Sequence, residues 1–338
     1  MRLAVIGAGS FGTVLASIAL ANGHTVRLWC RTQAQADQIN QTGVNERFHP
    51  GLVLHDVQAT SDLDVAVSDA ELVVLSVPSK GMSDVCSKLS AFLPEGVGLV
   101  STTKGIQASG FLMMSEVIEQ ACPGHPVGVL SGPNLAAEIA QRHLTASVIA
   151  SPSAPLREKA TEALGCKYLR LYSATDRVSV ELGGALKNIY AIACGLAAAL
   201  NVGANTQAAL MTRALAEMSR LASYLGGNPM TFLGLAGVGD LIVTCSSPLS
   251  RNYRIGWHMG QGKSLAEAEA EIGQVAEGIN TLSLIHQRAL EMGVVMPIVE
   301  GLYEVIHSNK PARQVAVKLM QAAQTSDVEF VLPSQPGP

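Results

Sequence analysis

Short apolar runs alternate with helix-like segments along the first half of the chain. Most of the runs are rich in Val, Leu and Ile and lack polar alternation, which is typical of parallel strands covered on both faces. The predicted strands are Leu3–Ile6, Val26–Trp29, Leu72–Val77, Val97–Val100, Val127–Leu130 and Ser147–Ala150. The predicted helices between them are Thr13–Asn22, Thr32–Gln41, Met82–Leu89 and Phe111–Gln120. This alternation predicts an α/β fold with a doubly wound sheet.

After Tyr168–Tyr172 the pattern changes, and only helices are expected. A long Ala-rich helix at Asp176–Leu200 precedes a second one at Asn205–Leu225, which a Gly-Gly-Asn-Pro sequence ends. Further helices are expected after the capping box at Ser264–Glu267, at Gly278–Met292, at Pro297–His307 and from Pro311 onward. We therefore predict an α/β domain at residues 1–172, a helical domain at residues 173–324 and a loose tail at residues 325–338.

A glycine-rich turn, Gly7-Ala8-Gly9-Ser10-Phe11-Gly12, directly follows the first predicted strand and opens the first predicted helix. In this context Gly7 permits the tight turn, Gly9 lets the backbone approach a pyrophosphate, and Gly12 lets the helix pack on the strand. The helix N-terminus offers amide donors to the anion. The sequence therefore predicts an N-terminal, Rossmann-like doubly wound sheet that binds a dinucleotide, followed by an all-helical C-terminal domain.

The end of the second predicted strand bears on the choice of cofactor. An acidic residue in Leu28-Trp29-Cys30-Arg31 would bind the ribose 2′-hydroxyl of NAD, but the segment contains no carboxylate. Arg31 can pair with a 2′-phosphate instead, which favours NADP over NAD. The alternative is that Arg31 is an ordinary solvated side chain.

Composition narrows the class of protein. Hydrophobic residues make up 48% of the 338 residues and charged residues only 15%, so a large core forms and intrinsic disorder is excluded. With 23 Lys and Arg against 27 Asp and Glu, the net charge is −4, which argues against nucleic acid as a partner. Six scattered cysteines without a Cys-x-x-Cys pair indicate a reduced, cytoplasmic protein, and no metal site is predicted.

The longest apolar stretch, Leu182–Leu200, approaches the ~20 residues that span a membrane. It contains Lys187 and Asn188, which are costly in lipid, so we predict a buried core helix and no membrane span. Small residues share the helix face of Lys187 and leave room for a ligand. They are Gly183, Gly184, Ala191 and Cys194.

Lys187 is a candidate for acid–base chemistry. Desolvation lowers the pKa of a lysine toward neutrality, so that the side chain can exchange a proton with an alcohol or a carbonyl. The alternative is a lysine that extends outward to solvent or forms a purely structural ion pair.

Other polar groups suit a phosphorylated substrate. Asp240 follows Gly237-Val238-Gly239 and precedes an apolar turn at Leu241–Cys245, and it can orient a lysine. Arg251, between Ser250 and Asn252, can hold a phosphate with two hydrogen bonds. Lys104 follows a predicted strand end, the edge at which α/β sheets bind ligands. Lys104 and Arg251 can equally be surface charges.

Together these motifs resemble the bacterial NAD(P)-dependent glycerol-3-phosphate dehydrogenases. They occur in that family's order from Gly7 to about Glu277. They are Gly7–Gly12, Ser101–Gly105, Ser131–Pro133, Glu181–Asn188, Gly234–Asp240 and Ser247–Asn252. The resemblance implies reversible reduction of dihydroxyacetone phosphate to sn-glycerol 3-phosphate, which feeds glycerophospholipid synthesis.

The resemblance also implies roles for individual residues. Lys187 matches the family's proton donor and acceptor, and Lys104 and Asp240 match its supporting catalytic residues. Substrate positions fall on Lys104, Gly132, Asn134, Lys187, Asn188, Asp240, Ser250, Arg251 and Asn252. Cofactor positions fall on Gly7, Gly9, Ser10, Phe11, Gly12, Arg31, Phe48, Lys104, Ala136, Arg251, Val275 and Glu277. Asn134 stands where the family has Ser or Thr, although its amide still provides a hydrogen-bond donor.

Two other functions remain open from the residues. One is a related lysine-dependent dehydrogenase of a hydroxy acid, which would also need a group that binds a carboxylate. The other is a sensor that binds NADP without catalysis, although such a protein has no need of a desolvated lysine. The apolar excess further suggests a homodimer in which part of the apolar surface is covered by the partner.

Overall fold

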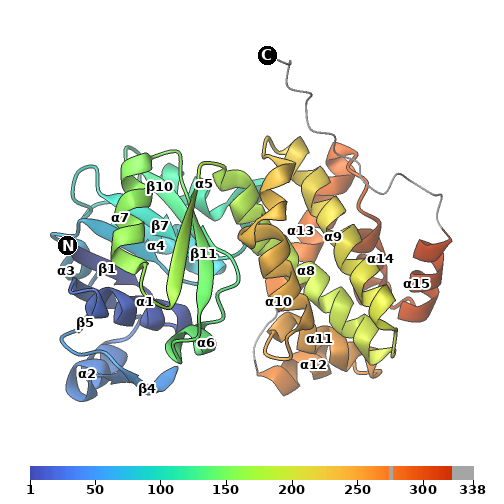
Figure 1. Cartoon of the computed structure of the whole chain (residues 1–338), viewed down its shortest axis with the longest axis horizontal. Helices are drawn as coiled ribbons and strands as arrows, with labels where there is room; N and C mark the ends of the chain where they lie inside the picture. Colours follow the sequence, from blue (N-terminus) through green and yellow to red (C-terminus); the bar gives the residue numbers. More distant parts are fainter. Residues whose placement is uncertain (274–276, 322–338) are drawn as a thin grey trace, which may run out of the picture. The chain divides into compact units, whose positions relative to one another are not determined.

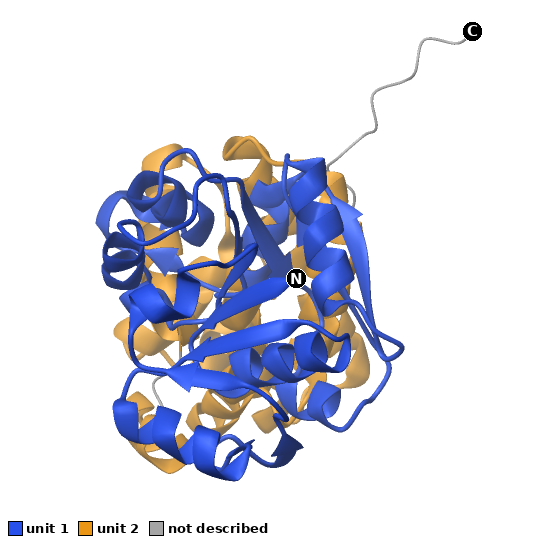
Figure 2. Cartoon of the chain, turned by 90° about the vertical axis from the view of Figure 1, so that its left-hand side faces the viewer, with its two compact units in different colours: residues 1–184 blue, residues 185–338 orange. Residues whose placement is uncertain are grey.

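The computed structural model of the chain describes residues 1–273 and 277–321 (Figure 1). The chain forms two compact units, Met1–Gly184 and Ala185–Pro338 (Figure 2). Helix α8 (Arg177–Ala199) begins in the first unit and ends in the second. The domain boundary near Ser173 stays a prediction, and the predicted tail lies outside the described residues.

The first unit is built on an eight-stranded sheet in the order β12-β11-β10-β7-β6-β1-β2-β5. All six apolar runs predicted as strands belong to it, which confirms the predicted α/β class. The strands are β1 (Arg2–Ile6), β2 (Thr25–Trp29), β5 (Gln58–Thr60), β6 (Leu72–Leu75), β7 (Gly98–Ser101), β10 (Val127–Ser131), β11 (Thr145–Ala150) and β12 (Leu169–Ala174).

Two of these strands, β11 and β12, run opposite to the other six. Strand β11 pairs antiparallel with β10, with Leu130 opposite Ile149, whereas the other pairs in the sheet are parallel. The expectation of parallel strands is therefore wrong for the β10–β11 pair, although β11 pairs parallel with β12. A short, fully buried apolar run has the same pattern in both directions, so its composition does not specify the direction.

Helices cover both faces of the sheet, as the uninterrupted apolar strands require. Along β1, Leu3 and Val5 pack with α1 and α7, whereas Ala4 and Ile6 pack with α3, α4 and α5 on the opposite face. The bounds of these helices are α1 (Ser10–Ala21), α3 (Leu63–Val67), α4 (Met82–Leu89), α5 (Met114–Ala121) and α7 (Ala154–Leu164). The remaining helices of this unit are α2 (Gln33–Thr42) and α6 (Ala136–Ala140).

Two short hairpins were not apparent in the sequence. They are β3 (Val44–Asn45) with β4 (His49–Val53), and β8 (Ile106–Gln107) with β9 (Leu112–Met113). The second hairpin delays the start of α5, which was predicted from Phe111, because Leu112 and Met113 pair with β8 instead. The Met113 N–H then donates to the Glu116 side chain at 2.7 Å, which caps the shortened helix.

The elements described in the second unit are helical, as predicted. They follow α8 as α9 (Ala204–Tyr224), α10 (Asp240–Ser246), α11 (Arg251–Gly260), α12 (Leu265–Ile272), α13 (Glu277–Met292), α14 (Pro297–His307) and α15 (Ala312–Met320). The expected turn at Leu241–Cys245 is wrong, because these residues form α10. The preceding segment, Leu235–Gly239, is already a π-helix, so the chain enters α10 without a break.

Helix α8 is the apolar stretch that raised the question of a membrane span. Among the described residues it is the one helix long and apolar enough to cross a bilayer, yet 89% of its apolar window is buried inside the protein. Such burial confirms the prediction of a core helix.

Within the second unit, α8 and α11 cross at glycines that allow backbone contact. A Cβ at Gly195 would lie 1.9 Å from the Tyr253 carbonyl oxygen, and a Cβ at Gly256 would lie 1.9 Å from the Ile192 carbonyl oxygen. Both obstacles are backbone atoms, which cannot rotate away as a side chain can. The two glycines therefore fix how closely α11 approaches α8.

We expect Gly256→Ala to destabilise the protein by about 1–3 kcal/mol, because the added methyl group forces the two helices apart. In a protein of 338 residues the melting temperature should fall by about 1–2 °C for each kcal/mol, which thermal unfolding followed by circular dichroism will measure. The matched control is Gly81→Ala, where the added Cβ meets nothing within 4 Å. Equal melting temperatures for both variants would contradict the close crossing.

Two buried carboxylates each hold the first turn of a helix. Glu181 accepts from the Ser115 N–H at 2.8 Å and from the Ser115 hydroxyl at 2.5 Å, at the start of α5. Glu217 accepts from the Ile298 N–H at 2.6 Å, from the Val299 N–H at 3.3 Å and from the Tyr190 hydroxyl at 3.2 Å, at the start of α14. Burial raises the pKa of each carboxyl to about 7, despite these hydrogen bonds.

The raised pKa of Glu217 predicts a pH-dependent stability. Its value is about 7 in the folded protein against 4.5 for the free group, so its contribution is full below about pH 4.5 and is lost as the pH rises to about 7. The neutral Glu217→Gln variant should therefore gain up to about 3 kcal/mol over the wild type at pH 8 and little at pH 5. Urea denaturation of both proteins at the two pH values measures the difference.

The control for this prediction is Glu300→Gln, which removes a carboxylate that is 59% exposed on the same helix. It should change stability equally at both pH values. A gain for Glu217→Gln that is the same at pH 5 and pH 8 would refute the prediction.

Candidate active site

The glycine turn between β1 and α1 has three glycines in three different environments. Gly7 has a φ of +119°, and a Cβ there would lie 2.6 Å from the Ser76 carbonyl oxygen. A Cβ at Gly12 would lie 2.0 Å from the Gly7 carbonyl oxygen, whereas one at Gly9 meets nothing within 4 Å. The packing of the turn therefore requires glycine at positions 7 and 12. At Gly9 the space is open, which leaves room for a ligand to approach the backbone.

The start of α1 suits an anion. Its N-cap is Gly9, which makes no side-chain cap, and its first turn contains no acidic residue. The amide groups of a helix N-terminus and the helix dipole both favour negative charge. The turn therefore fits the pyrophosphate of a dinucleotide.

Four other predicted cofactor residues lie in the first unit. Arg31 is exposed just beyond β2, the strand that pairs with β1, so it lies at the same carboxyl edge of the sheet. Phe11 and Ala136 both pack against the hydrophobic cluster on the α1 face. Phe48 is 36% exposed on the β3–β4 connection, with the Arg47 guanidinium 5.4 Å from its ring centroid.

The predicted substrate residues of the first unit meet beyond the carboxyl ends of β7 and β10. The Lys104 ammonium group donates to the Gly132 carbonyl oxygen at 3.2 Å and to the Asn134 side-chain oxygen at 2.7 Å. Asn134 therefore replaces a hydroxyl residue with an amide whose oxygen contacts Lys104. Its buried side-chain nitrogen has no hydrogen-bond partner among the described residues.

Helix α8 passes close to this lysine at a glycine. A Cβ at Gly184 would lie 3.3 Å from Lys104 Cγ and 2.7 Å from the Ser131 hydroxyl oxygen. Because Gly184 has no side chain, it leaves room for Lys104.

In the second unit, Lys187 and Asp240 form a buried ion pair. The Lys187 ammonium group on α8 donates to Asp240 Oδ1 on α10. The exposed fractions of the two side chains are 8% and 1%. A buried charge pair of this kind is costly to desolvate, so it is weak support for stability and stronger support for a functional role. The alternative that Lys187 extends outward to solvent is wrong.

Three further predicted residues of the second unit lie on α8 and at the start of α11. They are Asn188 on α8, and Ser250 and Asn252 at the start of α11. The Gly278 N–H donates to Asn252 Oδ1 at 3.2 Å, and a Cβ at Gly278 would lie 2.8 Å from the Asn188 carbonyl oxygen. Ser250 caps α11 by accepting from the Tyr253 N–H. The structure thus brings Asn188 and Asn252 together at the start of α13.

The positions of three other predicted residues give less information about the site. Arg251 is exposed at the first position of α11, directly before Asn252, and Glu277 is the first residue of α13. Val275 lies outside the described residues. For Arg251 and Glu277, these positions alone do not identify a ligand group.

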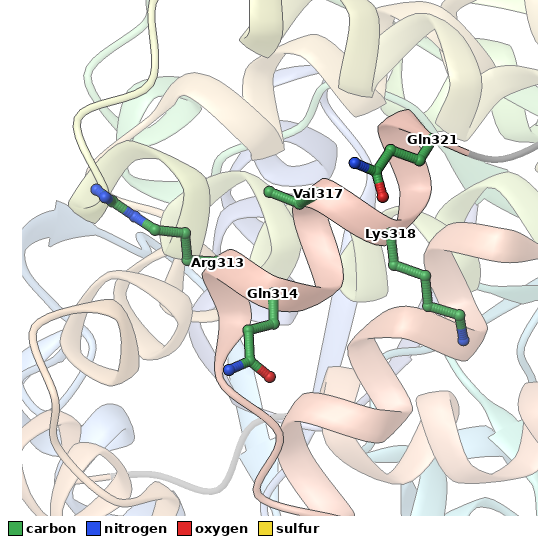
Figure 3. A pocket seen from close by; sticks show the side chains of 5 residues that line it. All are labelled: Arg313, Gln314, Val317, Lys318 and Gln321. Atoms are coloured by element: carbon green, nitrogen blue, oxygen red, sulfur yellow. The ribbon is translucent and has the colours of Figure 1, made fainter.

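A hollow of about 610 Å³ lies elsewhere, along α15. Figure 3 shows its five lining side chains, four of which lie on α15 and one on the residue that follows it. They are Arg313, Gln314, Val317, Lys318 and Gln321. No predicted site residue is among them, so this hollow is not the candidate site.

Sequence reasoning missed a group of side chains that hold the glycine turn from outside. Gln35 and Asn45 both donate to the Ala8 carbonyl oxygen, at 2.9 and 3.0 Å, and His49 contacts Ser10. No local sequence pattern indicates these contacts. Gln35 lies on α2, which was predicted, but Asn45 and His49 lie on the β3–β4 hairpin, which was not.

Comparison with known proteins agrees with this arrangement. The family model described as the N-terminus of NAD-dependent glycerol-3-phosphate dehydrogenase matches residues 2–156, and the model of its C-terminus matches residues 176–317. A glycerol-3-phosphate dehydrogenase [NAD(P)+] of Teredinibacter turnerae is 51% identical over 331 residues, which are 98% of this chain and 97% of the relative.

Solved structures give the same result. The crystal structure of glycerol-3-phosphate dehydrogenase from Coxiella burnetii has a TM-score of 0.89 and 34% identity, covering 95% of this chain and 99% of that one. The enzyme from Saccharomyces cerevisiae has a TM-score of 0.86 and 27% identity, with the same coverage. These matches confirm the resemblance and favour it over a hydroxyacid dehydrogenase or a sensor. The chain belongs to the family of NAD(P)-dependent glycerol-3-phosphate dehydrogenases.

Proposed function

We propose that this enzyme reduces dihydroxyacetone phosphate to sn-glycerol 3-phosphate reversibly, with Lys187 as the proton donor and acceptor. The observation that carries the proposal is the buried ion pair between Lys187 on α8 and Asp240 on α10. An ammonium group held by a carboxylate in a desolvated site is suited to general acid catalysis.

When bound, the reduced nicotinamide supplies a hydride to the carbonyl carbon of the substrate. The Lys187 ammonium group gives a proton to the oxygen of the alkoxide that forms, so that the product is the neutral alcohol. In the oxidation direction the Lys187 amine takes the hydroxyl proton. Asp240 orients Lys187 throughout, because it accepts a hydrogen bond from the Lys187 ammonium nitrogen.

We assign the substrate phosphate and hydroxyl groups to polar residues at the positions that the family resemblance implies. Arg251 provides a guanidinium that can hold a phosphate with two hydrogen bonds, and Ser250 and Asn252 add neutral ones. Lys104 and Asp240 are the proposed supporting catalytic residues, and Asp240 is the one that contacts Lys187. The other proposed substrate residues are Gly132, Asn134 and Asn188.

Arg31 selects the cofactor in this proposal. It is exposed beyond β2, where it can reach the 2′-phosphate of NADPH, and the neighbouring positions offer no carboxylate for the 2′-hydroxyl of NADH. We propose residues 1–172 as the dinucleotide-binding domain and residues 173–324 as the substrate domain.

One assay tests the reaction directly. The oxidation of NADPH and of NADH is followed by absorbance in two separate assays. One contains dihydroxyacetone phosphate, and the other contains the keto form of a hydroxy acid as the alternative substrate. Turnover with the phosphorylated ketone is expected, faster with NADPH. Tight cofactor binding without turnover on either substrate would overturn the catalytic proposal in favour of a sensor.

We further propose that the product feeds glycerophospholipid synthesis in the cytoplasm and that the enzyme is a homodimer. All six cysteines are free thiols, as a reducing compartment allows. Large apolar side chains remain exposed in the second unit, among them Leu233 at 68% and Leu290 at 69%. Sedimentation at micromolar concentration should give the mass of two chains, and the mass of one chain would exclude the dimer.

A further inference from the structure

The glycine turn is held from outside by hydrogen bonds to its carbonyl groups. The Ala8 carbonyl oxygen accepts from Gln35 Nε2 and Asn45 Nδ2, and Asn45 is fully buried. Asn45 Nδ2 also donates to Thr13 Oγ1 at 2.8 Å, and Thr13 Oγ1 in turn donates to the Gly9 carbonyl oxygen at 2.7 Å. The backbone of Ala8 and Gly9 is therefore fixed independently of any contact to Ser10.

His49 makes a separate contact, to Ser10. Its Nε2 atom lies 3.1 Å from the Ser10 carbonyl oxygen and 2.9 Å from the Ser10 hydroxyl oxygen. A carbonyl oxygen only accepts, so the tautomer that satisfies the first contact carries its hydrogen on Nε2. With a hydrogen on Nε2, this atom cannot accept the Ser10 hydroxyl hydrogen, which must point to a different acceptor.

Ser10 is the first residue of α1, at the helix end that suits a pyrophosphate. Its hydroxyl group therefore lies where an anionic oxygen of the cofactor would be bound. The β3–β4 hairpin therefore contacts the turn through two side chains, Asn45 at Ala8 and His49 at Ser10.

We propose that His49 is a positioning residue for the cofactor, which holds the Ser10 hydroxyl group so that its hydrogen is donated to a pyrophosphate oxygen of NAD(P)H. The inference rests on the proposed function and on the cofactor role that the family resemblance implies for Ser10. His49 itself contacts Ser10 and acts through it.

The first test replaces the imidazole with an apolar side chain. His49→Leu should raise the dissociation constants of NADPH and NADH by a similar factor, roughly five- to tenfold, because both share the pyrophosphate. Binding is measured by the fluorescence of the reduced nicotinamide. Adenosine 2′-monophosphate, which lacks the pyrophosphate, should bind the variant and the wild type equally. His49→Gln, which keeps a side-chain N–H donor, should restore binding to within about twofold.

A double-mutant cycle separates positioning from a structural role. Ser10→Ala should weaken binding of both cofactors, and His49→Leu should add nothing further in that background. A purely structural effect of His49→Leu would weaken binding by the same factor in both backgrounds. The matched control is His55→Leu, an exposed histidine two residues after β4, which should leave the dissociation constants unchanged.

The outcomes distinguish this inference from the proposed function. If the wild type binds cofactor and turns over substrate but His49→Leu binds NADPH and NADH normally, the inference alone is overturned. If the wild type binds neither cofactor, both are overturned. Equal weakening of adenosine 2′-monophosphate binding by His49→Leu would also refute the role assigned to His49, because that ligand has no pyrophosphate.

Discussion

Replacing Lys187 with alanine should reduce kcat by about 10²- to 10⁴-fold, the usual contribution of a positioned general acid. The loss is expected because Lys187 Nζ is the buried ammonium group that Asp240 orients. The dissociation constant of NADPH should stay close to that of the wild type, since the glycine turn belongs to other elements of the chain. Steady-state kinetics with dihydroxyacetone phosphate and fluorescence titration measure the two quantities.

This variant leaves the Asp240 carboxylate buried without its counter-ion, which can cost about 3–5 kcal/mol of stability. A second variant removes that complication. Lys187→Met combined with Asp240→Asn eliminates both charges, so its melting temperature should approach that of the wild type while its activity stays lost. Normal turnover in either variant would exclude Lys187 as the proton donor. Recovery of activity in the double variant would show that the ion pair is only structural.

Replacing Arg31 with aspartate should reverse the cofactor preference. The 2′-phosphate of NADPH loses a charge-assisted hydrogen bond and meets a carboxylate, so kcat/KM for NADPH should fall roughly 10- to 100-fold. The carboxylate can instead accept from the 2′-hydroxyl of NADH, so kcat/KM for NADH should rise. Because Arg31 is exposed, the fold should not be affected.

The measurement is the ratio of kcat/KM for NADPH to that for NADH. Lys159→Asp makes the same charge change at an exposed position of α7 and should leave the ratio unchanged. An unchanged ratio in Arg31→Asp would show that Arg31 does not contact the 2′-phosphate. A similar fall for both cofactors would point to a general electrostatic effect on binding.

Local patterns were sufficient for the features that lie within one stretch of chain. The glycine turn is contiguous, and its roles follow from steric contact at Gly7 and Gly12 and from open space at Gly9. The predicted strands were correct because a buried strand needs apolar residues at every position. Helix bounds such as Met82–Leu89 and Pro297–His307 were correct because caps and prolines act on neighbouring residues.

Features that depend on two distant stretches were harder to predict. The sequence suggested that Asp240 can orient a lysine, and the structure brings it to Lys187, from another helix. Nothing in the sequence indicated that Asn45 and His49 would contact Ala8 and Ser10, because polar side chains are compatible with any exposed loop. The direction of β11 was likewise not encoded in its composition.

The sequence by itself therefore determined the fold class, the dinucleotide turn and the family, since each depends on residue types at fixed spacing along the chain. The tertiary structure decided which polar groups meet: Lys187 with Asp240, Lys104 with Asn134, and His49 with Ser10. The physical reason is that hydrogen bonds and ion pairs act over a few ångströms in space. Spacing along the chain does not determine such proximity until the helices and strands have packed.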